Sequence, residues 1–129
     1  MREIKFRAWD KELKEYININ NIAIDPTNGD VIELGGYELL DVIHFAVLEQ
    51  YTGIKDKNGV DIYEGDYIRT KSNIYEVEWF NTAFWAIPDS GHGSSQPISR
   101  LYEYEDGTAY RIEVIGNIHE NAGLLEEQS

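Results

Sequence analysis

The chain lacks cysteine altogether. A disulfide framework, a zinc site built on thiolates and a cysteine nucleophile are therefore excluded. Because disulfides are typical of secreted proteins, their absence favours a protein that works inside the cell. The first ten residues, MREIKFRAWD, alternate charged and apolar side chains and contain no continuous apolar region of the kind that a signal peptide needs. We therefore expect a cytoplasmic protein.

Long apolar runs and prolines are scarce as well. No stretch of about 18 apolar residues occurs, so we expect no segment that spans a membrane. The three prolines leave no room for a stiff linker, and the chain has no internal repeat or low-complexity tract. A length of 129 residues, of which 42% are hydrophobic and 12% aromatic, fits one folded unit with a real core.

Positive charge is in short supply, since 11 Lys and Arg residues face 24 Asp and Glu residues and the net charge is −13. Such a field repels phosphate backbones and anionic lipids and speeds encounters with a basic partner. It disfavours nucleic acid as a partner and gives no reason to expect membrane binding. The first 14 residues are an exception, because five of them are basic and three acidic.

Short alternating segments separated by turn residues predict a mainly β fold with one or two short helices. The turn at Asp25–Asp30 is a strong signal, because its Asn-Gly pair tolerates the positive φ of a hairpin connection. The expected strands are residues 2–9, 16–19, 22–24, 31–34, 66–71, 75–80, 84–87, 101–105 and 108–115, with tight turns at Asn81–Thr82 and Asp106–Gly107.

Two segments are candidates for the short helices. Residues 38–50, ELLDVIHFAVLEQ, fit helical spacing, but residues 42–48 could equally form a buried strand. We favour a helical turn that leads into a strand. Residues 120–127 are expected to form a terminal helix with Leu124 and Leu125 facing inward.

The stretch from residue 64 to residue 115 resembles a small SH3-like barrel, because a Gly-Asp corner and a strand precede two hairpins. We therefore expect a single unit, 1–129, with two parts. Residues 1–50 would form an N-terminal β-hairpin region, and residues 51–129 an SH3-like small barrel that ends in the short helix. Fold analogy of this kind assigns no activity.

Residues 51–69, YTGIKDKNGVDIYEGDYIR, combine glycines with acids and lysines. An EF-hand loop starting at Asp56 fails, because Gly59 falls at the fourth position and the loop needs glycine at the sixth. A phosphate-binding loop fails too, since no Gly-Lys-Ser/Thr ending is present. We expect two turns instead, at Asn58–Gly59 and at Gly65. The expected apolar anchors are Ile54, Val60, Ile62, Tyr63, Tyr67 and Ile68, and the acids expected to cap the turns and stay in solvent are Asp56, Asp61, Glu64 and Asp66.

Three blocks, in their order and separation, resemble the YopX family of small phage and prophage proteins. The blocks are RAWD within Phe6–Asp10, QYTGIKDKNGVDIYEGDYIR at Gln50–Arg69, and VIGNIHENAGLLEE at Val114–Glu127. The resemblance implies a mainly β fold with an SH3-like C-terminal part, expressed in the cytoplasm of a bacterial host. It brings no catalytic residue, cofactor or substrate.

No catalytic or metal constellation stands out. His44, His92 and His119 lie far apart in the chain, without the close pair that zinc sites usually show. His92 has Ser94 and Ser95 nearby, but a Gly-flanked loop is a poor support for a Ser-His-acid triad. The carboxylate pairs Glu64/Asp66, Glu76/Glu78 and Glu103/Glu105 are each expected to share a solvated face. We therefore assign no catalytic residue, metal or cofactor.

Four aromatic residues flank one predicted hairpin: Trp79, Phe80, Phe84 and Trp85. A site that stacks nucleic-acid bases on aromatic rings needs surrounding cations, whereas the acids Glu76 and Glu78 interleave with these rings. We therefore expect most of the rings to pack in the core. Rings that stay exposed would dock a partner protein. The candidate docking residues are Trp79, Phe80, Trp85, Glu76 and Glu78.

The leading hypothesis is a non-enzymatic accessory protein that binds another, unidentified protein in the bacterial host. The alternative is a nucleic-acid-binding small barrel that uses the basic N-terminal strand, and the third hypothesis is a small enzyme with an unrecognised site. Open sheet edges also make a homo-oligomer an option.

Overall fold

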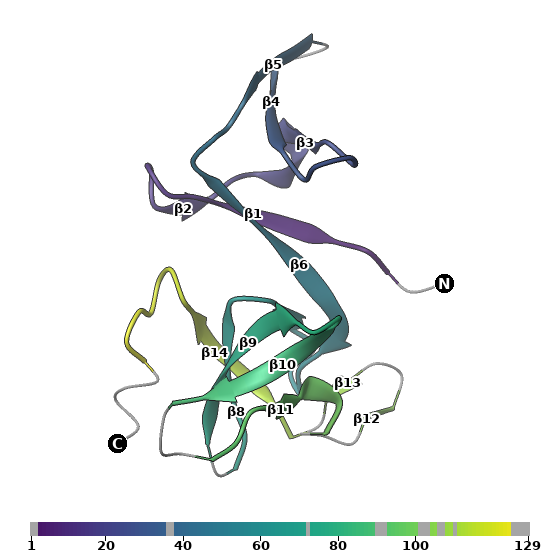
Figure 1. The fold of residues 1–129 in the computed structure, drawn as a ribbon, viewed down its shortest axis with the longest axis vertical. Helices are drawn as coiled ribbons and strands as arrows, with labels where there is room; N and C mark the ends of the chain where they lie inside the picture. Colours follow the sequence, from purple (N-terminus) through teal and green to yellow (C-terminus); the bar gives the residue numbers. More distant parts are fainter. Residues whose placement is uncertain are drawn as a thin grey trace. The chain divides into compact units, whose positions relative to one another are not determined.

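The computed structural model describes residues 3–35, 38–71, 73–89, 93–100, 104–105, 108–109 and 111–124. The chain divides into two compact units, Lys5–Gln50 and a second that combines Met1–Ile4 with Tyr51–Ser129 (Figure 1). Within the described ranges, the helices are two three-residue 3-10 turns, η1 (Ile19–Asn21) and η2 (Ile98–Arg100). The prediction of a mainly β fold is confirmed.

The Lys5–Gln50 unit is built from two groups of antiparallel strands. Its strands are β1 (Phe6–Asp10), β2 (Glu15–Tyr16), β3 (Ile22–Ile24), β4 (Val31–Gly35), β5 (Glu38–Val42) and the beginning of β6 (Ala46–Lys55). β1 pairs with β2 and β6, while β4 lies between β3 and β5. The expected turn at Asp25–Asp30 is confirmed, because Gly29 has φ +79° and Asp25 N donates to Asp30 O at 2.9 Å.

Strand β1 is buried on both of its faces rather than on one. Ala8 is fully buried with Ile22 and Val31 in the core of this unit. Trp9, on the opposite side of β1, is 7% exposed and packs edge-on against the Tyr16 ring at 4.9 Å between centroids. Alternation in the sequence indicated a half-buried strand, but it could not show that a second aromatic would cover the other side.

The helical turn expected within residues 38–50 is wrong. The segment forms β5 and β6, with a turn at His44 and Phe45 between them. β5 completes a ladder with β4, and Ile43 N donates to Val31 O at 2.7 Å. β6 pairs with β1 in an antiparallel ladder. Pairing with strands distant in sequence overrides the helical spacing, which only local side chains support.

The second unit contains a five-stranded sheet in the order β11-β10-β9-β8-β14, which curls into a half barrel (Figure 1). Its strands are β8 (Asp66–Arg69), β9 (Ile74–Phe80), β10 (Ala83–Pro88), β11 (Gln96–Pro97) and β14 (Glu113–Asn117). The end of β6 pairs with β7 (Asp61–Tyr63) and with β13 (Thr108–Ala109), which in turn pairs with β12 (Tyr104–Glu105). The SH3-like comparison and the division at residue 50 stay predictions.

One face of the curled sheet supplies the core of the second unit. The buried members are Ile62, Ile68, Tyr75, Val77, Ala86, Ile98 and Ile112, with Ile54, Phe84 and Val114 packed against them. Most of the expected anchors from residues 51–69 contribute to burial, but Val60 is 47% exposed and is not an anchor. The core therefore joins the glycine-rich segment to the β8–β9–β10 sheet and to β14.

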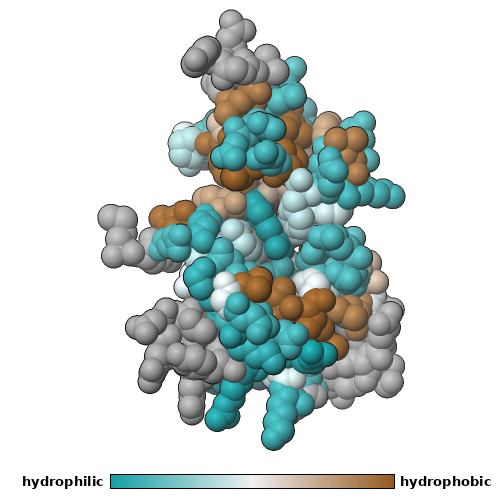
Figure 2. Space-filling view, turned by 180° about the vertical axis from the view of Figure 1, so that it is seen from behind, coloured by the Kyte–Doolittle hydropathy of each residue, from teal (hydrophilic) through white to brown (hydrophobic). Residues whose placement is uncertain are grey.

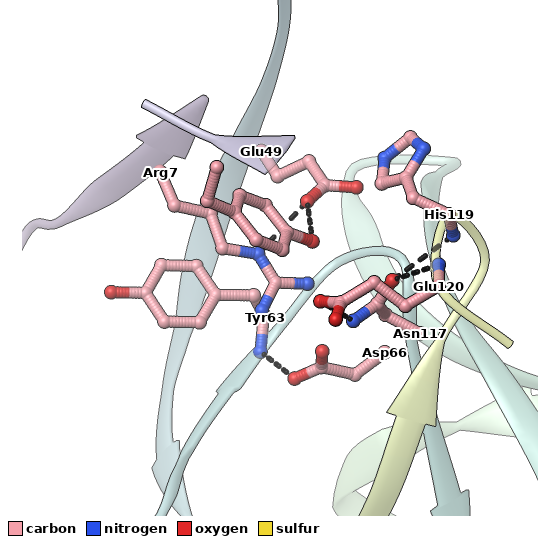
Figure 3. A network of polar contacts seen from close by, with 8 residues as sticks. Arg7, Glu49, Tyr63, Asp66, Asn117, His119 and Glu120 are labelled. Atoms are coloured by element: carbon pink, nitrogen blue, oxygen red, sulfur yellow. Dashed lines mark hydrogen bonds and ion pairs between the residues drawn. The ribbon is translucent and has the colours of Figure 1, made fainter. Parts of the chain in front are cut away.

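The C-terminal part departs from the prediction in two places. Residues 118–124 form turns rather than the start of a helix, and residues 125–127 lie outside the described ranges. The Asn117 side chain accepts hydrogen bonds from His119 N at 3.0 Å and Glu120 N at 2.9 Å, which closes the first turn (Figure 3). The strand expected at 108–115 is split into β13 and β14 by a turn at Arg111, and the predicted turn Asp106–Gly107 is not among the described residues.

The Asp56 carboxylate is the centre of the 51–69 segment. It is fully buried, and its Oδ1 accepts from Asn58 N at 2.8 Å and Val60 N at 2.9 Å. Its Oδ2 accepts from Val114 N at 2.9 Å, so one side chain closes a turn and holds a distant strand. Gly59 has φ +81°, which confirms the tight turn expected there.

Asp66 plays a similar part at the next turn. It is 1% exposed, and its Oδ2 accepts from Tyr63 N at 2.8 Å across the turn that contains Gly65, with φ +87° (Figure 3). Asp56 and Asp66 therefore cap turns as predicted, but the expectation that they stay in solvent is wrong. Asp61, by contrast, is partly exposed and pairs with Lys55 Nζ at 2.6 Å.

We expect Asp56→Ala to lower the free energy of unfolding by about 3 kcal/mol or more, because it leaves buried N–H groups without an acceptor. Urea unfolding followed by fluorescence measures the change. The matched control is Asp61→Ala, which removes a partly exposed ion pair and should cost less than about 1 kcal/mol. Equal losses in the two variants would contradict the central role of Asp56.

Candidate functional site

The β9–β10 hairpin carries all of the predicted docking residues. Its two strands are joined by Asn81 and Thr82, whose φ angles are +48° and +62°. Positive φ at both central residues defines a type I′ turn, whose twist matches that of the flanking strands. The tight turn predicted at Asn81–Thr82 is confirmed, but Thr82 is β-branched and pays for its left-handed conformation with strain.

The strand register sorts the predicted residues onto two faces of the hairpin. Tyr75 and Val77 are buried on the core side, and Trp79 follows them in the same alternation. Glu76, Glu78 and Phe80 alternate onto the opposite side, where Trp85 stands directly across from Glu78. Glu76, Glu78, Phe80 and Trp85 therefore share one surface, which we call the aromatic–acidic face.

Trp79 does not belong to the aromatic–acidic face. It lies opposite Phe84, and the two rings meet edge to face with centroids 4.8 Å apart. Phe84 packs against the core, whereas Trp79 is 51% exposed at the end of the strand. The expectation that most of the four rings are in the core is wrong, since of these rings only Phe84 is packed against it.

The aromatic half of the face is held rigidly. The rings of Phe80 and Trp85 stack with centroids 4.8 Å apart and planes 20° from parallel. Trp85 Nε1 donates to the Phe80 carbonyl oxygen at 3.0 Å, which fixes the indole relative to the turn. Phe80 is nevertheless 38% exposed. The result is a preformed aromatic platform, which loses little conformational entropy when something binds to it.

The acidic half of the face contains one carboxylate in an unfavourable setting. Glu76 is half-buried, and loss of hydration together with repulsion from Glu78 raises its pKa to about 6. Its carboxylate makes no hydrogen bond or ion pair with any described residue. No Lys or Arg occurs from residue 74 to residue 99. The hairpin therefore brings two acids together without supplying a positive charge of its own.

Adjacent strands also place titratable groups on this side of the sheet. Tyr67 on β8 stands directly opposite Glu76, and Arg69 stands opposite Ile74. Arg69 is engaged, because its Nη2 lies 3.2 Å from the Glu113 carboxylate on β14. Lys57 Nζ lies at the same distance from Glu113, and these two cations lower the pKa of that carboxyl group.

Surface hydrophobicity is not confined to the hairpin. On the side shown in Figure 2, apolar areas alternate with larger polar ones. Outside the hairpin, the exposed large apolar residues are Ile4, Leu13, Ile19, Phe45 and Val60. Single exposed apolar residues are normal on soluble domains, so these are not taken as sites. What distinguishes the hairpin is the combination of stacked rings with unneutralised carboxylates.

The basic N-terminal strand does not offer Arg7 as a free cation. Its Nε lies 2.8 Å from Glu49 Oε1, and its guanidinium carbon lies 4.6 Å from the centre of the Tyr16 ring. Tyr16 Oη donates to the same Glu49 oxygen at 3.0 Å. Glu49 is 3% exposed, so the carboxylate that holds Arg7 is buried.

The structure describes two of the three histidines, and these two belong to different units. His44 is exposed on the turn before β6, and His119 is half-buried in the turn after β14. His92 lies outside the described residues, so the proposed triad partner is not placed. In the part of the chain that is described, no group of three or more His, Asp or Glu side chains could hold a metal ion.

Two residues that cap turns, Asp10 and Asn117, were missed by the sequence reasoning. Asp10 accepts from the backbone N–H groups of Glu12 and Leu13 at 2.8 and 2.9 Å, as Asp56 and Asn117 do at their own turns. At Gly116, an added Cβ would lie 2.4 Å from Asn121 Oδ1, which accepts from Asn117 N at 3.1 Å. A signal was present, since Asp or Asn directly precedes each of these turns.

The comparisons with known proteins agree with the three sequence blocks. A family model described as YopX protein matches residues 5–126. The chain belongs to the YopX family. The turn-capping residues Asp10, Asp56, Asp66 and Asn117 all lie in the YopX-like blocks, so in this chain those blocks build the fold.

A solved structure is similar over almost the whole chain. The crystal structure of protein EF1440 from Enterococcus faecalis is 28% identical, with a TM-score of 0.58. The likeness covers 97% of this YopX-family chain and 99% of the EF1440 chain. The search of curated proteins found no match. In the described structure, none of the helices has the length and apolar character needed to cross a membrane.

We expect Glu76→Gln to raise the free energy of unfolding at pH 7 by up to about 1 kcal/mol, a figure reduced because water screens the exposed part of the carboxylate. The folded-state pKa of about 6 exceeds the ordinary 4.5, so the stability linked to this proton is complete below pH 4.5 and is lost as the pH rises through 6. Urea unfolding at pH 4.5 and 7 measures both effects. Glu12→Gln, at an exposed turn, is the control, and a gain that is equal at the two pH values would contradict the assignment.

We expect Thr82→Gly to stabilise the protein by about 1 kcal/mol, because glycine adopts positive φ without strain in a type I′ turn. Thermal or urea unfolding of the variant measures the gain. The comparison is Thr27→Gly, at an exposed turn position outside the positive-φ set, where the Thr27 bonds to Asp25 are lost and stability should fall. A loss of stability in Thr82→Gly would show that relief of strain does not outweigh the loss of the hydrogen bond that Thr82 Oγ1 donates to Asn81 O at 2.6 Å.

Proposed function

We propose that this YopX-family protein is a non-enzymatic module that binds another protein through its β9–β10 hairpin. The docking residues are Trp79, Phe80, Trp85, Glu76 and Glu78. The observation that carries the proposal is the stacked Phe80–Trp85 pair, with Phe80 exposed and Trp85 half-buried, on the same surface as Glu78 and Glu76. The Glu76 carboxylate has no hydrogen-bond or ion-pair partner among the described residues. Exposed Trp and Phe side chains are favoured anchors of protein interfaces, and a rigid platform lowers the entropic cost of association.

Chemistry and charge support a protein partner over the rival functions. Stacking of nucleic-acid bases on aromatic rings requires surrounding cations, whereas the rings here are beside Glu76 and Glu78. In the basic N-terminal strand, Arg7 pairs with Glu49 and lies over the Tyr16 ring. The contacts described above contain no observation in favour of an enzyme.

The setting that we propose follows from the family resemblance. The protein would be a phage- or prophage-encoded accessory protein acting in the cytoplasm of the bacterial host. Its net charge of −13 suits an encounter with a positively charged partner, since opposite fields raise association rates. A homo-oligomer would be compatible with the same role.

Affinity capture from bacterial host extract, followed by titration of the purified captured protein, tests the proposal. We expect Trp79→Ser/Phe80→Ser to raise Kd by about tenfold or more, because it removes two exposed anchors from one hairpin. The matched control is Leu13→Ser/Phe45→Ser, which removes two residues of comparable exposure from the other unit. Circular dichroism verifies that each variant stays folded.

The proposal fails if no protein is retained across a range of salt concentrations. It also fails if the two double variants weaken binding of the captured protein equally, because the hairpin would then have no special part in binding.

A further inference from the structure

We propose that the aromatic–acidic face binds a lysine- or arginine-bearing segment of the partner protein, whose cationic side chain lies against the Phe80–Trp85 platform and pairs with Glu76 and Glu78. This inference rests on the proposed function and names the chemistry of its partner. It commits the face to a basic peptide segment rather than to an apolar helix or a second copy of the chain.

The arrangement of the four side chains fits a cation with an apolar stem. Glu78 and Trp85 are direct cross-strand partners on one side of the sheet, and Phe80 stacks on Trp85. An acid and an aromatic ring are thus neighbours at a spacing of about 5 Å between Cβ atoms. Lys and Arg side chains lay their apolar stems along such rings while the charged end reaches a carboxylate.

The aromatic–acidic face carries two acids, and its own strands supply no cation to neutralise them. The described residues around Glu76 present Glu78 on the same strand, Tyr67 on β8, and Ile87 and Trp85 on β10. The nearest basic residue on the neighbouring strand, Arg69, is paired with Glu113. A cation from outside would neutralise two like charges, one of which is partly removed from water without a partner.

Charge complementarity also separates this occupant from the alternatives. A purely apolar partner would bury Glu76 and Glu78 without compensation, which disfavours binding. A second copy of this chain would bring its own two acids to the interface, because a two-fold contact juxtaposes the same surface patch. A basic segment is the occupant whose chemistry matches both the rings and the carboxylates.

Titration with short synthetic peptides tests the inference. The probes are a peptide in which lysine and serine alternate, its arginine counterpart, and matched peptides with glutamine or glutamate in place of the cation. Tryptophan fluorescence and calorimetry follow binding to the full-length chain at low and physiological salt. We expect the two basic peptides to bind and the glutamine and glutamate peptides to bind at least about tenfold more weakly.

Matched variants separate a local contact from general attraction by an acidic protein. Glu76→Gln/Glu78→Gln should weaken binding of the basic peptides by about tenfold, while Glu12→Gln/Glu15→Gln, with the same change in net charge, should change it less than about twofold. Phe80→Leu should weaken binding by about threefold, because leucine keeps the apolar contact and removes the cation–π attraction. Phe45→Leu, at another exposed phenylalanine, should have no effect.

Three results would overturn the inference. One is equal binding of the lysine and glutamine peptides. Another is equal weakening by the two acidic double variants, which would show that only the long-range field matters. The third is a dimer of the chain, detected by sedimentation, that dissociates in the Phe80→Leu variant. A second copy of the chain would then occupy the face.

Failure of the inference can be told apart from failure of the proposed function. If a captured protein depends on Trp79 and Phe80 but basic peptides bind no better than neutral ones, the module stands and the partner chemistry is wrong. If no captured protein depends on the hairpin, the proposed function itself falls.

Discussion

The second unit depends on the buried side chain of Asp56. The Asp56 carboxylate holds the turn after β6 through Asn58 N and Val60 N, and holds β14 through Val114 N. Lys57 N, which donates to Ile112 O at 2.9 Å, strengthens the same junction. Because β14 pairs with β8 and β8 with β9, the position of the hairpin is set through this chain of backbone contacts. The glycine-rich segment could be taken for a ligand-binding loop, but its buried acids Asp56 and Asp66 accept hydrogen bonds from the backbone.

The residues that hold the fold together and the residues that we propose bind a partner fall on different stretches of the chain. The blocks that carry the YopX resemblance supply turn caps and core anchors, as Asp10, Asp66 and Asn117 illustrate. The β9–β10 hairpin lies between the second and third blocks, and it presents side chains that the fold does not consume. Glu76 is placed at some energetic disadvantage, which is common where a surface is shaped for an external partner.

Local chemistry made part of this structure predictable. Asn81 and Gly59 tolerate positive φ and so reveal their turns, and alternation along β9 correctly separates Glu76 and Glu78 from Val77. Residues 38–50 could not be assigned in this way, because their strands depend on pairing with β4 and β1. The burial of Asp56 could not be predicted either, because one of its hydrogen-bond donors, Val114 N, is 58 residues away in sequence. Exposure of Phe80 depends on whether another element covers its face, which no local pattern reports.

The edge of the curled sheet next to Trp85 is a two-residue strand, β11, in which Pro97 is the cross-strand partner of Trp85. Proline has no N–H to offer, and so short a strand gives little template for a further one. Neighbouring molecules are therefore poorly able to extend the sheet by stacking edge to edge at this side. A partner at this edge would therefore be bound through side chains rather than through backbone pairing.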